Sequence, residues 1–90
     1  MSVNIELSSA FAIYTDDVLN IDVQGKTVRE ALHDLVRQFP KLKRVLLNDK
    51  GDLQQTYDFF INEQSIYPKN MALPLNDGDR LSILYLIHGG

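Results

Sequence analysis

The amino-acid sequence predicts a small α+β domain in which a mixed β-sheet packs on one main helix. Three features indicate this: alternating apolar and polar residues near the start, an amphipathic segment over residues 27–39, and an apolar run over residues 81–87. Predicted strands precede and follow the helix, which gives the order β-β-α-(α)-β-(β)-β. A chain of 90 residues has room for one hydrophobic core, so we expect a single domain over residues 1–90.

The first two strands are predicted near the start of the sequence. Odd-numbered positions of residues 3–7 are apolar and their neighbours are polar, which is the period of a half-buried strand. A polar and small segment follows, with Asp16 and Asp17 as its turn. The apolar residues over 18–23 then indicate a second strand. Because the two strands are close in sequence, we expect an antiparallel pair.

The main helix is predicted over residues 27–39. Thr27 and Glu30 have the spacing of a capping box, which satisfies backbone N–H groups at a helix start. Pro40 ends the helix, because the residue before a proline is driven out of the α conformation. A short second helix is expected over residues 41–47. The apolar positions of the main helix share one face: Val28, Ala31, Leu32, Leu35, Val36 and Phe39.

The aromatic-rich segment over residues 57–61 predicts a third strand, after a turn at residues 48–51. Residues 62–65 are expected to form a tight connection. Ile66 would then begin a short return strand, which Pro68 restricts to an edge of the sheet.

The last strand is predicted over residues 81–87, where Ser82 is the only polar residue. Such a run is typical of a central strand that is covered on both faces. Alternation separates its side chains into two sets. We expect the first set to face the helix and the second to face away: Leu81, Ile83 and Tyr85, against Ser82, Leu84 and Leu86.

Composition excludes several classes of function. A net charge of −3 argues against binding to nucleic acid or an anionic membrane, which requires a basic surface. No apolar run reaches the ~20 residues of a membrane span, and residues 1–4 do not resemble a signal peptide. The chain has no cysteine, and its two histidines are far apart, so we expect no metal site. The expected location is the cytoplasm.

Two glycines, Gly89 and Gly90, close the sequence. A carboxylate is a poor electrophile and must be activated, typically as an acyl-adenylate made from ATP. Glycine has no Cβ, so a Gly-Gly tail can enter a narrow enzyme channel beside a nucleotide phosphate. The alternative is a frayed tail with no chemical role.

These features together resemble the β-grasp, ubiquitin-like sulfur carriers, which include the small subunit of molybdopterin synthase and the thiamine-pathway carrier. The resemblance covers essentially the whole chain, and its most specific parts are Asp77-Gly78-Asp79, the apolar last strand and the final Gly89-Gly90. It implies a β-grasp fold. It also implies that an E1-like enzyme adenylates the terminal glycine and that a sulfur donor converts the acyl group to a thiocarboxylate. A second, biosynthetic enzyme then accepts the sulfur.

Carried over by position, Gly90 would hold the reactive carbonyl and Gly89 would provide the flexible approach. The chain would be a protein cosubstrate and not an enzyme, with ATP-Mg used by the activating partner and no cofactor of its own. Many molybdopterin-type carriers have a proline shortly before Gly-Gly, whereas residues 85–88 contain none. A carrier that supplies sulfur for cysteine, thiamine or another sulfur-containing metabolite is therefore an equal alternative.

A carrier needs an exposed docking surface beside its tail. We expect Phe60, Leu84 and Leu86 to form an apolar patch for partner enzymes, with His88 as a shape contact next to the glycines. The alternative is that loops and the short helix cover this patch. Two pairs of acidic residues are better explained by helix and turn chemistry than as catalytic dyads: Glu30 with Asp34, and Asp77 with Asp79.

Three other functions are compatible with the sequence. The chain could be a ubiquitin-like modifier that is conjugated to lysine through Gly90. It could be a β-grasp interaction module with an incidental Gly-Gly, or a regulatory subunit bound permanently to a larger enzyme.

Overall fold

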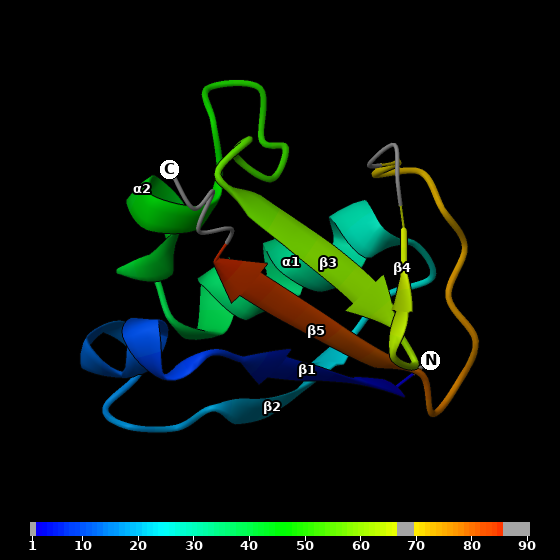
Figure 1. Cartoon of the computed structure of the whole chain (residues 1–90), viewed down its shortest axis with the longest axis horizontal. Coiled ribbons are helices and arrows are strands. Elements are labelled where there is room, and N and C mark those ends of the chain that lie inside the picture. Colours follow the sequence, from blue (N-terminus) through cyan, green and yellow to red (C-terminus); the bar gives the residue numbers. More distant parts are fainter. Residues whose placement is uncertain (1, 67–69, 86–90) are drawn as a thin grey trace.

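The computed structural model describes residues 2–66 and 70–85, the last of these by its backbone alone. The predicted order of strands and helices is confirmed, with one added 3-10 helix, η1 (Figure 1). The elements are β1 (Ser2–Leu7), η1 (Ser9–Tyr14), β2 (Asn20–Gln24), α1 (Val28–Gln38), α2 (Leu42–Leu46), β3 (Tyr57–Ile61), β4 (Gln64–Ser65) and β5 (Arg80–Tyr85).

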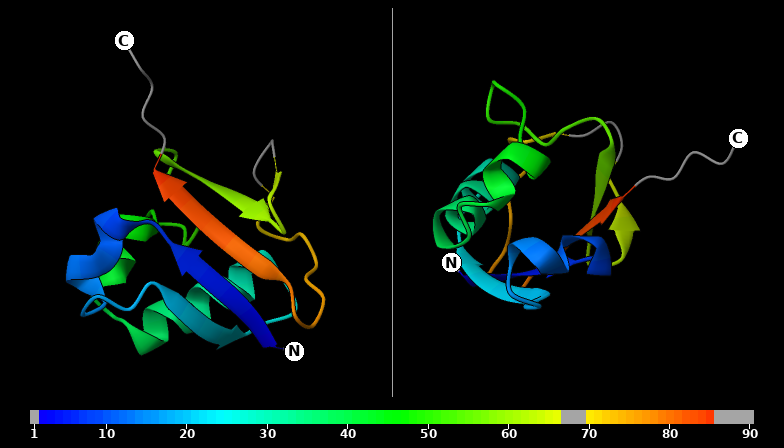
Figure 2. Two further views of the ribbon diagram at one scale, coloured as in Figure 1. Left: turned by 60° about the horizontal axis from the view of Figure 1, so that its bottom comes forward. Right: turned by 90° about the vertical axis from the view of Figure 1, so that its left-hand side faces the viewer.

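The strands form one mixed, five-stranded sheet in the order β2-β1-β5-β3-β4. β1 is antiparallel to β2 and parallel to β5, and β3 is antiparallel to both β4 and β5. The predicted antiparallel pair and the central position of the last strand are therefore confirmed. Helix α1 crosses one face of this sheet (Figure 2).

The hydrophobic core lies between α1 and the sheet. The inward side chains of the central strands are fully buried, including Val3, Ile5, Leu81 and Ile83. This confirms that Leu81 and Ile83 face the helix. The second helix contributes Leu42 and Leu46, both with no exposed surface. Helix α1 supplies the other side of the core with four buried residues: Val28, Ala31, Leu32 and Leu35.

An apolar run is typical of a strand covered on both faces, but the described part of β5 is covered by the helix on one face only, as the predicted exposure of Leu84 requires. Leu84, which points away from the helix, is 40% exposed. The short helix α2 packs its buried leucines into the same core as α1, so it does not cover the opposite face.

The capping arrangement of α1 is confirmed, with one difference. The backbone N–H of Glu30 donates to Thr27 Oγ1 at 3.2 Å, as predicted. The Glu30 carboxylate accepts from the backbone N–H of Lys26 at 3.0 Å, instead of from Thr27. The helix ends at Gln38, and Phe39 caps it just before Pro40.

Two local predictions at the sheet edges are wrong. The return strand β4 begins at Gln64 and not at Ile66. Asn62 and Glu63, with φ of 51° and 71°, make a tight two-residue turn. Consecutive left-handed residues match the twist of a hairpin, so the turn needs only these two. The second strand begins at Asn20, which leaves Val18 exposed in the preceding loop.

Candidate functional site at the end of β5

The residues that carry the proposed chemistry follow β5 directly. Leu86, His88, Gly89 and Gly90 lie outside the described residues, so their assigned roles stay predictions. The structure describes the strand that leads to them. β5 is hydrogen-bonded to β1 on one side and to β3 on the other, in a register that pairs Tyr85 with the first residue of β3. The tail segment therefore continues from a central strand that the fold holds on both sides.

Phe60 and Leu84, which we call the Phe60–Leu84 patch, share the sheet face opposite α1. In the β3–β5 register Phe60 pairs with Ser82 and Leu84 pairs with Asp58, so all four side chains alternate onto one face. Phe60 and Leu84 are diagonal neighbours across the two strands, within reach of a contact between long side chains. Phe60 is half-buried and Leu84 is 40% exposed. The structure thus places these two predicted residues together and leaves Leu84 accessible.

Three carboxylates share the sheet face of this apolar patch, along with the basic Arg80. Asp58 lies opposite Leu84 on β3, and Glu6 lies opposite Ser82 on the other side of β5. The outer strand β2 places Asp22 opposite Asn4, which puts another acid on the same face. An apolar patch with acidic neighbours complements a partner surface that is apolar and basic.

The turn at residues 76–79 fixes the start of β5. Both carboxylate oxygens of Asp79 accept hydrogen bonds, from Asn76 N at 2.7 Å and from Asn62 Nδ2 at 3.0 Å. Asp77 accepts from the backbone N–H of Ser2 at 2.8 Å. Gly78 has a φ of 87°, which favours glycine. These acids therefore join three parts of the sheet, as the turn-chemistry interpretation predicted.

The other acidic pair also has structural roles. Glu30 caps the start of α1, and Asp34 accepts from the backbone N–H of Gln24 at 2.9 Å. That hydrogen bond, together with those from Arg37 and Gln38, holds the pKa of the Asp34 carboxyl below its ordinary value. No cluster of metal-ligating residues occurs in the described part of the chain.

Sequence reasoning missed an exposed apolar surface near the same end of the sheet. Ile13 on η1 is 78% exposed and Val18 is 43% exposed. η1 follows β1, which runs parallel to β5, so η1 lies toward the end of the sheet where β5 finishes (Figure 2). The sequence carried a signal for η1, because Phe11 and Tyr14 are three positions apart and can share one face of a 3-10 helix. In the structure, Phe11 is buried and Tyr14 packs against the core.

The comparisons with known proteins agree with this architecture. The model of the ThiS family matches residues 7–90 of the chain. A search of curated protein sequences finds no match. No helix among residues 2–66 and 70–85 has the length and apolar character needed to cross a membrane.

Several solved structures share the fold. SAMP1 from Haloferax volcanii is 25% identical, with a TM-score of 0.79 and full coverage of both chains, 100% and 100%. The complex of BexX and CysO from Amycolatopsis orientalis contains a chain that is 21% identical, with a TM-score of 0.85, coverage being 98% of this chain and 99% of that one. The complex of subunits 1 and 2 of the molybdopterin-converting factor from Helicobacter pylori contains another, 22% identical, with a TM-score of 0.66 and coverage of 100% of each chain. With its mixed sheet, its single main helix and a family match over nearly its whole length, the chain belongs to the ThiS family of β-grasp sulfur carriers.

Proposed function

We propose that the chain is a sulfur carrier whose reactive group is the Gly90 carboxylate. An E1-like enzyme transfers AMP from ATP-Mg to this carboxylate and releases pyrophosphate. A sulfur donor then attacks the acyl carbon, AMP leaves, and the product is a thiocarboxylate. A biosynthetic enzyme of molybdopterin, thiamine, cysteine or related metabolism accepts the sulfur. The observation that carries the proposal is the family match, which extends through Gly89 and Gly90.

The chain's own part in this chemistry is presentation of the carboxylate. A central strand, paired with β1 as far as Ile83 and with β3 as far as Tyr85, gives the tail a rigid base. Gly89 lacks a Cβ, so the tail can pass through a narrow channel. The activating enzyme supplies the nucleotide and the acid–base groups. We therefore propose a protein cosubstrate, not an enzyme, that works in the cytoplasm and holds no cofactor.

The Phe60–Leu84 patch is the proposed docking surface for these enzymes, together with Leu86 and His88. Leu84 is accessible and lies on the strand that leads to the tail, so a partner that binds the tail can contact it. Two of the similar structures are complexes of two proteins, one of BexX with CysO and one of two subunits of a molybdopterin-converting factor. They support a function that depends on protein partners.

The test is intact-mass spectrometry after incubation with a candidate E1-like enzyme, Mg-ATP and sulfide. A mass gain equal to the replacement of one oxygen by sulfur is expected for the full chain. A chain that lacks Gly90 is the control and should not change in mass. An unchanged mass of the full chain, with an enzyme shown to be active on its own carrier, would contradict the proposal.

A ubiquitin-like modifier is the second candidate function. The observation that favours it is the likeness to SAMP1, described in related structures as a small archaeal modifier protein. An epitope-tagged chain expressed in cells would test it. Conjugates linked from Gly90 to lysine, without a detectable thiocarboxylate, would support the modifier, whereas absence of conjugates would support the carrier.

A further inference from the structure

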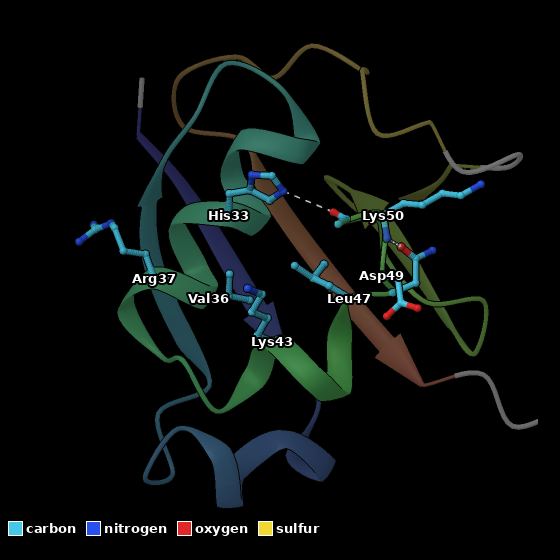
Figure 3. Close-up of a pocket in the computed structure, with 9 residues that line it drawn as sticks. His33, Val36, Arg37, Lys43, Leu47, Asp49 and Lys50 are labelled. Atoms are coloured by element: carbon cyan, nitrogen blue, oxygen red, sulfur yellow. Dashed lines mark hydrogen bonds between the residues drawn. The ribbon is translucent and has the colours of Figure 1, made fainter.

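The helix side of the molecule carries a pocket that the proposed carrier function does not use. It lies between α1, α2 and the turn that follows α2, and in Figure 3 the sheet lies behind it. Its volume is about 520 Å³, within the range of pockets that bind small ligands. The residues that line it are His33, Val36, Arg37, Lys43, Leu47 and the turn 48–51.

Hydrogen bonds and an ion pair hold the outer wall of this pocket against α1. His33 Nε2 lies 3.4 Å from the carbonyl oxygen of Gly51, the contact drawn as a dashed line in Figure 3. At the far end of the turn, Arg29 pairs with Asp52 at 2.9 Å. The side chain of Asn48 accepts from two backbone N–H groups inside the turn. The wall is therefore ordered by contacts with the helix.

The pocket concentrates positive charge in an acidic protein. Lys43 and Lys50 line it, and no described residue forms an ion pair with either one. Arg37 also lines it and pairs with Asp34, which is not a lining residue, while Asp49 is the one acid in the lining. Five of the nine basic residues of the sequence fall between positions 37 and 50: Arg37, Lys41, Lys43, Arg44 and Lys50.

The backbone of the turn does not form a cradle for a small phosphate. Such cradles use free, converging backbone N–H groups. Here the N–H groups of Lys50 and Asp52 donate to the Asn48 side chain, and that of Gly51 donates to the Asn48 carbonyl. The positive charge comes instead from long lysine side chains spread around the rim. This arrangement suits several separate carboxylates better than one compact phosphate.

We propose that this pocket binds an acidic segment of a partner protein. Val36 and Leu47 form an apolar floor, which would take an aliphatic side chain of that segment. Lys43 on the rim would face one carboxylate of that segment, and Lys50, whose side chain extends outward from the turn in Figure 3, would meet a carboxylate farther along it. Charge complementarity selects this occupant, because three basic side chains and one acidic side chain line the pocket.

The pocket would give the protein a second partner-binding surface, separate from the tail. The Phe60–Leu84 patch is on the sheet face opposite α1, whereas the pocket is built on α1 itself. One partner segment can thus hold the helix side while another enzyme contacts the sheet face. The proposal does not depend on thiocarboxylate chemistry.

The test is a titration of the isotope-labelled chain, followed by NMR, with the peptide acetyl-Glu-Glu-Leu-Glu-Glu-amide. Amide shifts are expected to map to residues 33–37 and 43–51. The uncharged peptide acetyl-Gln-Gln-Leu-Gln-Gln-amide should bind much more weakly. Lys43→Glu should weaken binding by about tenfold, since it replaces an attraction with a repulsion. Lys26→Glu is the matched control, because Lys26 is exposed and lies outside the pocket.

Several outcomes would overturn the proposal. Equal weakening by Lys43→Glu and Lys26→Glu would indicate general charge attraction. Inorganic phosphate or ATP that displaces the peptide from the pocket at lower concentration would indicate a small-anion site. Shifts at the same residues that grow with protein concentration alone would indicate that a second copy of the chain is the occupant. Both lysines are exposed, so circular dichroism should show that each variant is folded.

Discussion

Asn62 connects the β3–β4 turn to the start of β5 through Asp79. Its Nδ2 donates to Asp79 Oδ1 at 3.0 Å, and its Oδ1 accepts from the backbone N–H of Arg80 at 2.9 Å. Because Asp79 also bonds the backbone of Asn76, one side chain joins the hairpin to the turn that starts the tail-bearing strand. The base of β5 is therefore fixed at the end opposite to the proposed reaction.

Two substitutions of Asn62 distinguish the contribution of its side-chain hydrogen bonds, which we call the clamp, from the contribution of its left-handed backbone. Asn62→Gly keeps the φ of 51° accessible but removes both side-chain hydrogen bonds. We expect it to lower the free energy of unfolding by about 1–2 kcal/mol. Asn62→Ala should cost more, because alanine also resists the left-handed conformation. Urea unfolding measures both, and equal stabilities of Asn62→Gly and the original chain would show that the clamp contributes nothing.

Stability should decrease in acid through Asp34. The hydrogen bond from Gln24 N, with those from Arg37 and Gln38, holds its pKa in the folded state below the ordinary value of 3.8. A lowered carboxyl pKa stabilises the folded state above that value, and this contribution is lost as the pH falls through the folded-state pKa.

Asp34→Asn should therefore be less stable than the original chain at pH 7, with a smaller difference at pH 3. Urea unfolding at both pH values tests this. Asp16→Asn is the control, since Asp16 is exposed and in a left-handed position that asparagine tolerates. The same difference between the original chain and Asp34→Asn at both pH values would contradict the assignment.

Gly25 allows α1 to approach the end of β2. A Cβ at this position would lie 2.6 Å from the backbone nitrogen of Ala31 and 3.0 Å from its Cα. Backbone atoms cannot move aside cheaply, so Gly25→Ala should lower the free energy of unfolding by about 1–3 kcal/mol. Gly78→Ala provides a contrast, because nothing lies within 4 Å and only the φ of 87° opposes the substitution.

We expect Gly78→Ala to cost about 1 kcal/mol, the conformational penalty alone. Thermal unfolding of both variants would separate the steric cost from the conformational cost. A Gly25→Ala protein as stable as the original would show that the helix is not as close to β2 as the structure places it.

The sequence predicted the elements whose signals are local and periodic. β3 was predicted with its observed bounds, and the Thr27 cap placed the start of α1, because period and capping depend on neighbouring residues. η1 and the start of β4 were missed, since they depend on how tightly the chain turns between elements. The apolar run of β5 showed only that the strand is central, and the exposure of Leu84 followed from the presence of a single main helix to cover the sheet.

Only part of the candidate site was predicted, because the sequence shows local patterns and not the contacts between distant elements. Alternation correctly put Phe60 and Leu84 on one face, because strand register fixes side-chain direction. The pocket on the helix side was not predicted. Its walls come from α1, α2 and a turn that only the tertiary structure brings together. The roles of Gly89 and Gly90 come from the family and not from geometry.

Leu84 is the best single position at which to test the proposed docking surface. It is partly accessible, so Leu84→Ser should lower the free energy of unfolding by only about 1 kcal/mol and leave the fold intact. If a partner covers it, the loss of apolar contact should lower the kcat/KM of adenylation by about fivefold to tenfold. Pyrophosphate release by an E1-like enzyme measures this.

Val18→Ser is the matched control for Leu84→Ser. Val18 has a similar exposure, 43% against 40%, and lies near the same end of the sheet, but it is on the loop before β2, which is separated from β5 by β1. It therefore tests whether the effect belongs to the open face of β5 and not to any exposed apolar residue at this end. Its replacement should leave the rate of adenylation nearly unchanged. If both variants are adenylated as fast as the original chain, the activating enzyme does not use the Phe60–Leu84 patch, and recognition would have to come from the tail or from the helix side. If only Leu84→Ser is slow, the open face of β5 is the surface that guides the tail into the enzyme.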